Sequence, residues 1–407
     1  MRLFCAIFLF AATAWAQSTL PPSGNASAEL ARRALAIHAN ALVLDAHIDT
    51  PYRLTRTGGD ISQRLSKGHF DFVRAREGGL DASVFAVYVA SRFNSSPTRA
   101  NGKSAAYAEA QRILKLIDKI LAQNTGVAAQ AFTPDEVRRI VQSGKHAIIL
   151  GLENASPIGN DLQNLHELAQ RGICYITLTH SKDNHISDSS YDRQRTHKGL
   201  SEFGEQVVRE MNRLGVMIDV SHISDEAFWQ VLALTQSPVI ASHSSLRKFR
   251  RMQRNLSDSM LVAIKKNGGI VCLNFGSFFL SEAFQSSVVR QERKIAEARQ
   301  TFQDDAARLE MELQRIRTES PITNATVGDL IKHIDYAVQL LGIEHVGLGS
   351  DFDGIDVVPL GLEDVTCYPK LTAELLRLGY SESDIRKLAG ENFLRVWQAN
   401  IDKRNFR

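Results

Sequence analysis

The sequence has few of the features that mark disulfide-rich, membrane-spanning or multidomain proteins. Only four cysteines occur in 407 residues. Cys5 lies in an apolar N-terminal run, and Cys174, Cys272 and Cys367 are far apart and odd in number, which does not fit a disulfide framework. Beyond the N-terminus, no run approaches the roughly 20 apolar residues of a membrane-spanning helix. No linker rich in proline, glycine and serine divides the chain, so we expect one domain over residues 17–407.

Neither basic nor acidic residues are in large excess. The formal net charge is +3, and basic and acidic residues are interspersed, so no basic stripe or acidic tail predicts a nucleic-acid partner. A hydrophobic content of 44% is enough for a large buried core. We therefore expect a globular protein that acts on a small molecule.

The first 16 residues have the form of a secretory signal peptide. Met1-Arg2 is followed by the apolar run Leu3–Ala12 and by the small-residue cleavage motif Ala14-Trp15-Ala16. We expect cleavage before Gln17 and export to the periplasm or the medium, with an uncleaved signal anchor as the alternative. The charged C-terminus lacks the apolar tail of a lipid-anchor signal, so no stable membrane anchor is expected.

Eight short apolar, β-branched runs alternate with helical patterns, which is typical of parallel strands buried on both faces. The predicted strands are Leu42–Ala46, Val84–Val89, Ala147–Leu152, Tyr175–Thr179, Val216–Val220, Val239–Ala241, Ile270–Asn274 and His345–Leu348. Helical patterns between them include Tyr107–Leu121 and Glu202–Leu214. Eight strands that alternate with helices predict an α/β fold, a (β/α)8 TIM-like barrel, with an open doubly wound sheet as the alternative.

A charged segment, residues 281–320, interrupts this pattern after the seventh predicted strand. Its helical stretch opens with Arg290, Glu292, Arg293, Lys294, Glu297 and Arg299. Mixed charges at helical spacing favour an exposed helix. Because the segment follows a strand, it lies on the active-site side of a barrel. There it could form a lid, an interface arm or a solvated excursion.

Ionisable side chains stand at the ends of six predicted strands. In chain order they are His47 with Asp49, then Glu153, His180, His222, His243 and Asp351. A parallel barrel gathers the carboxyl ends of its strands at one mouth, so we expect these side chains to meet there. One such histidine alone is more often a structural residue, but six strands that deliver ionisable groups predict a site.

Imidazole and carboxylate groups in this pattern predict two metal ions. His47 and Asp49 are two positions apart on an extended segment, so both side chains point to the same side. These ligand types suit zinc. His222 and His243 offer ligands for a second ion, and Glu153 can bridge the pair because a carboxylate has two oxygens. Two zinc ions on one water make hydroxide at neutral pH and polarise the carbonyl that it attacks, which predicts hydrolysis of a peptide or amide bond.

Several ordered segments match one known family. The strongest are residues 199–204 (GLSEFG), 214–222 (LGVMIDVSH) and 345–354 (HVGLGSDFDG). Shorter matches are residues 177–180 (TLTH), 242–245 (SHSS), 254–255 (RN) and 361–365 (GLEDV). With these segments, from Leu42 to about Trp397, the chain resembles the membrane (renal) dipeptidase family of binuclear zinc peptidases, which belongs to the amidohydrolase superfamily.

The resemblance implies a ligand set for the two zinc ions. His47, Asp49 and Glu153 would bind one ion, and Glu153, His222 and His243 the other. Glu153 and a water or hydroxide would then bridge the two ions, which agrees with the ligands chosen from the residues alone.

The resemblance also implies three residues that bind the substrate. His180 would steady the developing oxyanion, and Asp351 would take the proton from the bridging water and pass it to the leaving amine. Arg254 would bind the free carboxylate of the substrate, and its fixed distance from the metals would restrict substrates to dipeptides. On spacing alone, Arg254 is one of several neighbouring arginines, and Asp351 is not distinguished from Asp353.

The activity implied is a zinc-dependent dipeptidase for L-L dipeptides and possibly L-D dipeptides, and a homodimer is implied as well. In an exported protein, cell-wall dipeptides with a D-residue are one hypothesis. A different amidohydrolase, such as a lactonase, a phosphotriesterase or a β-lactam-opening enzyme, is the first alternative. Lactonases and phosphotriesterases typically open with His-x-His and bridge with a modified lysine, unlike His47-x-Asp49 and Glu153. A non-catalytic exported binding protein is the second alternative.

Overall fold

A parallel sheet forms the centre of the computed structural model, which describes residues 24–94 and 103–405. Its strands are β1 (Leu44–Ile48), β2 (Ala82–Tyr88), β3 (Ala128–Gln130), β4 (His146–Glu153), β5 (Ile173–Thr177), β6 (Met217–Asp219), β7 (Ile240–Ser244), β8 (Ile270–Leu273) and β9 (Val346–Leu348). The strand order is β1-β2-β4-β5-β6-β7-β8-β9, and β3 pairs with β4 off this path. A parallel bridge from Ile48 to Phe352 connects β1 with the segment after β9, which nearly closes the predicted barrel.

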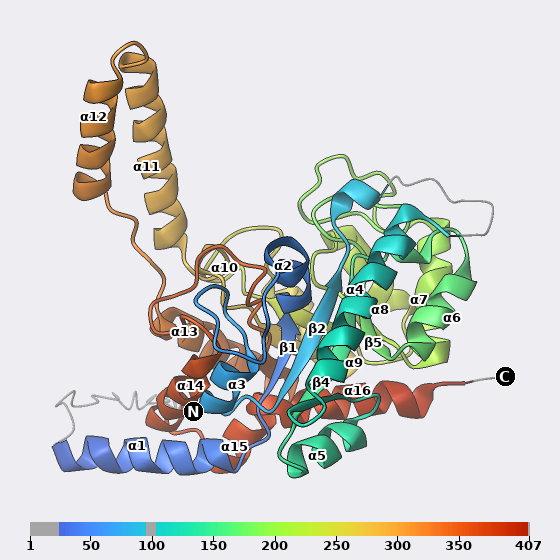
Figure 1. Cartoon of the computed structure of the whole chain (residues 1–407). Helices are drawn as coiled ribbons and strands as arrows, with labels where there is room; N and C mark the ends of the chain where they lie inside the picture. The colour runs from blue at the N-terminus through green and yellow to red at the C-terminus, as the bar shows by residue number, and fades with distance from the viewer. Residues whose placement is uncertain (1–23, 95–102, 406–407) are drawn as a thin grey trace, which may run out of the picture.

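Helices surround this barrel (Figure 1). They are α1 (Gly24–Ala39), α2 (Thr50–Thr57), α3 (Phe72–Glu77), α4 (Ala105–Gln123), α5 (Pro134–Gln142), α6 (Leu162–Gln170), α7 (Glu202–Leu214), α8 (Asp225–Leu234), α9 (Asp258–Asn267), α10 (Ser277–Leu280), α11 (Glu282–Thr301), α12 (Ala306–Glu319), α13 (Val327–Leu341), α14 (Tyr368–Arg377), α15 (Glu382–Arg386) and α16 (Asn392–Lys403). All eight predicted strands are present. The additional strand β3 was not predicted, because its three residues carry no apolar run.

Local sequence signals explain where the helices begin and end, and α7 is a clear example. The Ser201 hydroxyl accepts a hydrogen bond from the Gly204 N–H at the start of the helix, and Gly215 ends it in the left-handed conformation. Glycine adopts this conformation at little cost. The predicted helix Glu202–Leu214 therefore matches α7 residue for residue.

Two apolar clusters form the core. The larger one lies between the strands and the surrounding helices, and the smaller one includes Ala46, Tyr175 and Ile240 of the strands together with Phe393 and Trp397 of α16. Helix α16 is bonded to segments that precede strands, as in the hydrogen bond from Asn400 Nδ2 to the Pro238 carbonyl oxygen. The helix therefore covers the amino ends of the strands and leaves their carboxyl ends free for a site.

Helices α11 and α12 form a hairpin that projects from the barrel (Figure 1). Ala298, Leu313 and Ile316 are buried between the two helices. At the base, Gln291 and Lys294 of α11 donate hydrogen bonds to Ser320, just after α12. The predicted charged insertion 281–320 is thus a pair of exposed helices instead of one long helix.

The described residues contain no helix that is both long and apolar enough to cross a membrane. Cys174, Cys272 and Cys367 are buried and free, as the cysteine pattern predicted. The predicted signal peptide, residues 1–16, lies outside the described residues.

Candidate metal centre

The structure brings the predicted site residues together at the carboxyl ends of the strands. His47 lies in β1, Glu153 ends β4 and His243 lies in β7, whereas Asp49, His180, His222 and Asp351 lie in the loops after their strands. A cavity of about 920 Å³ opens over this end of the barrel, and its floor includes Asp49, Glu153, His180, His222 and Asp351.

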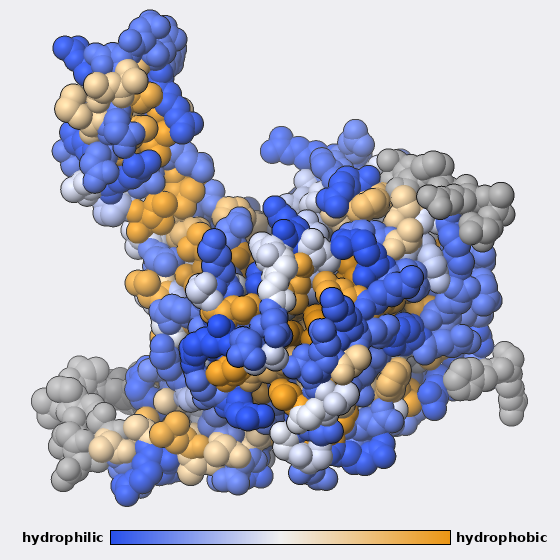
Figure 2. All heavy atoms as spheres, in the orientation of Figure 1, coloured by the Kyte–Doolittle hydropathy of each residue, from blue (hydrophilic) through white to orange (hydrophobic). Residues whose placement is uncertain are grey.

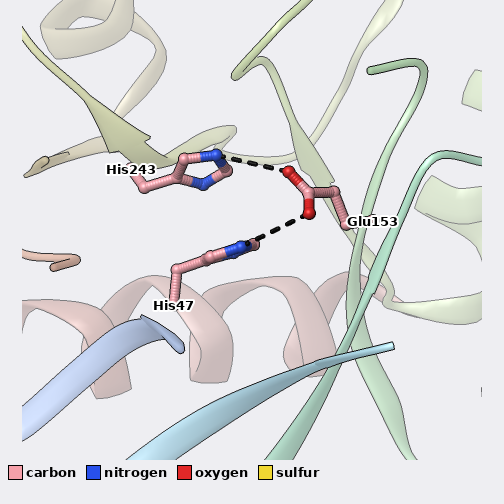
Figure 3. A group of neighbouring side chains, drawn as sticks. All are labelled: His47, Glu153 and His243. Atoms are coloured by element: carbon pink, nitrogen blue, oxygen red, sulfur yellow. Dashed lines mark ion pairs between the residues drawn. The ribbon is translucent and has the colours of Figure 1, made fainter. Parts of the chain in front are cut away.

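The two oxygens of the Glu153 carboxylate face different sets of side chains. Oε2 lies 3.6 Å from His47 Nε2, which is itself 3.3 Å from Asp49 Oδ2. Oε1 lies 3.2 Å from His222 Nε2 and 3.4 Å from His243 Nε2. Figure 3 shows Glu153 between His47 and His243, with one oxygen toward each. His180 Nε2 also lies 3.6 Å from Oε1, so the structure gathers the predicted ligands and His180 around one carboxylate.

Asp351 and Asp353 have different surroundings. These surroundings show which of the two lies at the site, a choice that sequence spacing alone left open. Asp351 lies close enough to His47 and Asp49 for all three to hold one ion, and it accepts a hydrogen bond of 2.7 Å from Asn274 Nδ2. Asp353 instead accepts hydrogen bonds from the Thr50 hydroxyl, the Arg53 guanidinium and the His69 N–H. Asp353 therefore holds two loops together, and Asp351 is the residue at the site.

Burial and charge set the protonation of the site. Burial alone would lower the pKa of His47, but the carboxylates of Glu153 and Asp49 together raise it well above its usual value. Burial alone would raise the pKa of Glu153, but the neighbouring histidines, His180 first, hold it well below its usual value. Burial, with the positive charge of Arg254 adding, holds the pKa of His222 well below its usual value. The Glu153 carboxylate is thus ionised, and the neutral His222 ring has one nitrogen lone pair that can bind a cation.

Several nitrogen and oxygen atoms of the site are buried without a hydrogen-bond partner. Such atoms are expected where a bound metal ion would take the place of the missing partner. Among them are His47 Nε2, Asp49 Oδ1 and His222 Nδ1. The Tyr175 hydroxyl donates its hydrogen to the Ala46 carbonyl at 3.0 Å, so it accepts from His47 Nδ1 at 2.7 Å. In the neutral ring, His47 Nε2 would present a lone pair to two carboxylates, so these carboxylates favour a positive charge at this nitrogen, either a proton or a bound cation. The donor set fits a metal ion.

Comparison with known proteins agrees with this chemistry. The model of the family described as membrane dipeptidase (peptidase family M19) matches residues 31–405. The chain belongs to this family. The predicted family, barrel fold and class of enzyme, a metallodipeptidase that hydrolyses peptide bonds, are thereby confirmed.

Individual relatives can be aligned with most of the length of this dipeptidase. The dipeptidase tcpJ of Claviceps purpurea is 30% identical over 329 residues, which are 81% of this chain and 68% of that protein. The crystal structure of the probable dipeptidase PvdM from Pseudomonas aeruginosa is 29% identical and covers 92% of this chain and 99% of its own, with a TM-score of 0.79. A metallopeptidase from Rhodobacter sphaeroides, solved with a phosphinate mimic of the dipeptide L-Ala-D-Ala, is 28% identical and covers 88% and 99%, with a TM-score of 0.71.

Residues behind the candidate ligands fix which ring nitrogen faces the site. Ser242 donates its hydroxyl hydrogen to Asp219 Oδ2 at 2.7 Å and lies 2.8 Å from His243 Nδ1, so it accepts from that nitrogen and leaves the His243 Nε2 lone pair toward Glu153. Supporting hydrogen bonds of this kind orient metal ligands and tune their affinity. Sequence reasoning missed Tyr175, Ser242 and Asp219, although Ser242 and Asp219 lie within the matched segments.

Two of the candidate site residues of the dipeptidase adopt the left-handed backbone conformation. His222 has a φ of 68° and Asp351 a φ of 64°. This conformation is unfavourable for residues other than glycine, and it tends to occur at functional sites that the surrounding structure holds in place. The strain is consistent with loops that are shaped to aim these two side chains at the cavity.

Arg254 differs from its neighbouring arginines in its partners. Arg247 pairs with Asp225 and Arg250 with Glu282. Arg254 is buried, and its two terminal nitrogens donate to the Ser244 hydroxyl at 2.8 Å and the His243 carbonyl at 2.7 Å. Its Nε is buried without a partner. The guanidinium is therefore held rigidly beside the ligand strand and has no carboxylate partner among the described residues.

Proposed function

We propose that this dipeptidase is an exported enzyme that binds two zinc ions per chain, with Glu153 as the bridge, and cleaves L-L and L-D dipeptides. The observation that carries the proposal is the position of Glu153, whose two oxygens face two separate donor sets. A carboxylate in this position lowers the repulsion between two cations, which is strong at short range in a buried site.

Each donor set would hold one ion. His47 and Asp49 would complete the set at Oε2, and His222 and His243 the set at Oε1. Bound zinc would lower the pKa of water to near neutrality and polarise the peptide carbonyl. Zinc is favoured because imidazole and carboxylate together match its ligand preference.

The residues of the chain would bind the dipeptide and move the proton. Arg254 would bind the substrate carboxylate by donating hydrogen bonds from its guanidinium, because a guanidinium matches a carboxylate bidentately. Burial, and then the neighbouring Asp49 carboxylate, raise the pKa of Asp351 well above its usual value. A carboxyl group with a raised pKa can take up a proton near neutral pH and pass it to the leaving amine.

His180 would donate a hydrogen bond to the oxyanion. Burial lowers its pKa, so the imidazole is neutral and carries one N–H. Its Nδ1 lies 3.4 Å from the Tyr88 hydroxyl. When that hydroxyl donates to Nδ1, the remaining N–H is on Nε2, which lies 3.6 Å from Glu153 Oε1 at the cavity floor. A donor fixed there would stabilise charge that develops only in the transition state.

Two parts of the proposal rest on relatives or on the sequence alone. Acceptance of a D-residue is supported by the Rhodobacter sphaeroides metallopeptidase, which was solved with a mimic of L-Ala-D-Ala. Export rests on the signal-like residues 1–16. The homodimer implied by the resemblance is tested by light scattering, and a monomeric mass would contradict it.

Elemental analysis of the purified protein, with hydrolysis of L-Ala-L-Ala before and after chelation, tests the proposed function. The expected result is about two zinc ions per chain and a cleavage activity that chelation removes and added zinc restores. Absence of a stably bound metal together with absent cleavage would contradict the proposal. Tight binding of a dipeptide without turnover would favour a binding protein instead.

A further inference from the structure

The cavity above the candidate metal centre has two chemically different walls. One wall is aromatic and polar, with Tyr52, Tyr88 and Tyr191 near His180 and His222. The other wall is largely apolar and is formed by Phe278, Phe279, Phe284, Val288, Ile322, Ile355 and Val357, which we call the apolar wall. The same segments also contribute the polar lining residues Glu292, Asn324 and Asp356. A substrate bound at the floor would therefore meet different surfaces on its two sides.

The apolar wall is assembled from segments that are bonded to one another. The Ser277 N–H donates to the Val357 carbonyl at 2.9 Å, and the Ser277 hydroxyl donates to Asn324 Oδ1 at 3.0 Å. The Thr323 N–H donates to the Ser287 hydroxyl of α11 at 2.9 Å. These bonds hold α10, the base of the α11–α12 hairpin and the loop after β9 together as one surface.

The hairpin contributes directly to this surface through Phe284, Val288 and Ile322 at its base. Figure 2 shows hydrophobic residues at the junction of the hairpin and the barrel, below a mostly hydrophilic hairpin. The charged insertion therefore has an apolar base at the cavity and a solvated outer part.

Large side chains of the wall are exposed to water. Phe278 is 40% exposed, Ile322 44% and Val357 40%. Apolar surface that is exposed together in a concave site marks a place where a ligand binds. The cavity volume of about 920 Å³ lies near the upper end of the roughly 300–1,000 Å³ of typical ligand pockets. A dipeptide with two methyl side chains would leave much of this wall in contact with water.

The position of the wall relative to the floor indicates which part of the substrate it meets. Phe279 lies beside Arg254, with 5.6 Å between the guanidinium carbon and the ring centre. A Cβ on Gly276 would lie 2.8 Å from Phe279 and 3.0 Å from Ile355, so these two side chains flank one glycine. Ile355 follows Gly354, which approaches the Asp351 carboxylate. The wall thus begins next to the residues proposed to bind the C-terminal carboxylate and to protonate the leaving amine.

We infer that the apolar wall binds the side chain of the second residue of the substrate and selects dipeptides with a large apolar group at that position. This inference rests on the proposed function, since the orientation of the dipeptide follows from the roles given to Arg254 and Asp351. The hairpin insertion is then a specificity element of the active site. The first residue would then face the tyrosine wall, whose rings carry polar hydroxyl groups.

A matched pair of substrate series tests the inference. The metal-replete enzyme is assayed with L-Ala-L-X, where X is Ala, Val, Leu or Phe, and with the reversed series L-X-L-Ala. We expect kcat/KM to rise about tenfold from X = Ala to X = Phe in the first series, because apolar groups in such pockets change discrimination by about tenfold or more. We expect a change of less than about threefold in the reversed series. A flat first series, or a larger rise in the reversed one, would overturn the inference.

Two adjacent residues of α11 provide a variant and its control. Val288 is half-buried and lines the cavity, whereas Val289 is 52% exposed and does not line it. Val288→Asp should reduce the preference for L-Ala-L-Phe over L-Ala-L-Ala to less than about threefold, and Val289→Asp should keep it. Ile322→Asp, at the other side of the hairpin base, should act like Val288→Asp. Equal preferences in all three variants and the wild type would refute the role of the wall.

Failure of this inference and failure of the proposed function give different results. If the metal-replete protein cleaves no member of either series, the proposed function is wrong. If it cleaves both series at similar rates regardless of X, the dipeptidase is as proposed and only the role of the apolar wall is wrong.

Discussion

Gly354 is a position where the addition of a single methyl group should disturb the active site. It lies in the loop after β9, it is exposed, and no core packing depends on it. A Cβ at this position would lie 2.3 Å from Asp49 Oδ2 and 2.5 Å from Asp351 Oδ1. Gly354→Ala therefore forces a methyl group against a proposed metal ligand and the proposed proton carrier without removing any side chain.

The size of the effect follows from these two distances. Ordinary van der Waals contact begins at 3.4 Å, so the methyl group and at least one carboxylate must move apart by about 1 Å. Misplacement of reacting groups by about 1 Å can cost about 100-fold in rate. We therefore expect kcat/KM to fall about 100-fold, which corresponds to about 2.7 kcal/mol in the activation barrier.

The assay compares Gly354→Ala with Gly126→Ala as the matched control. Gly126 lies in the turn before β3, and a Cβ there would meet no atom within 4 Å. Dipeptide hydrolysis, zinc titration and thermal unfolding are measured for both variants and the wild type. Gly354→Ala should lose activity and bind zinc more weakly with little change in unfolding of the chelated protein. Wild-type activity and zinc affinity in Gly354→Ala would refute the positions assigned to Asp49 and Asp351.

Three further predictions concern the bridge, its support and pH. Glu153→Ala should lower zinc content and abolish turnover, because two cations would then lack a shared anion, and unchanged metal content by elemental analysis would show that the bridge is wrongly assigned. Tyr175→Phe removes the acceptor for His47 Nδ1 and should weaken zinc binding about 10- to 100-fold in a competition titration, whereas equal affinity would show that this hydrogen bond does not orient the ligand. Burial lowers the pKa of His146 and of His333 from 6.5 to about 4. Each buried neutral histidine therefore makes its full contribution to the free energy of unfolding above pH 6.5. This contribution is lost as pH falls toward 4, because the unfolded chain then binds a proton more readily, and the loss per histidine is about 2 kcal/mol at pH 5. Denaturant unfolding of His146→Gln should therefore depend less on pH than that of the wild type, and an identical slope would contradict the assignment.

The sequence was sufficient to predict the strands and the candidate ligands for a physical reason. Strands of a barrel are buried on both faces, so each appears as an uninterrupted apolar run, and an ionisable residue at the end of such a run is conspicuous. Glu153, the last residue of β4, and His243 in β7 are examples. The same pattern could not reveal β3, which has only the residues Ala128–Gln130 and no apolar run.

Contacts between distant parts of the chain were beyond the sequence patterns. Tyr175 lies 128 positions from His47, and as an aromatic residue in a buried run it looked like ordinary core. Ser242 and Asp219 became recognisable as supports of His243 only when their hydrogen bonds were known. The apolar wall is a similar case, because its members come from separate segments whose proximity depends on the hairpin base.

Closure of the barrel and assembly of the site depend on the same hydrogen bonds. The Asp351 N–H donates to the His47 carbonyl at 3.0 Å, and the Asp49 N–H donates to the Phe352 carbonyl at 2.8 Å. These are the bonds that join β1 to the segment after β9, and three of their four residues are candidate site residues. Because the closure fixes Asp351 in its left-handed conformation, any change that opens this seam would separate Asp351 from His47 and Asp49. The hydrogen bonds that join β1 to the segment after β9 therefore keep a strained backbone position, at Asp351, in register with two candidate ligands.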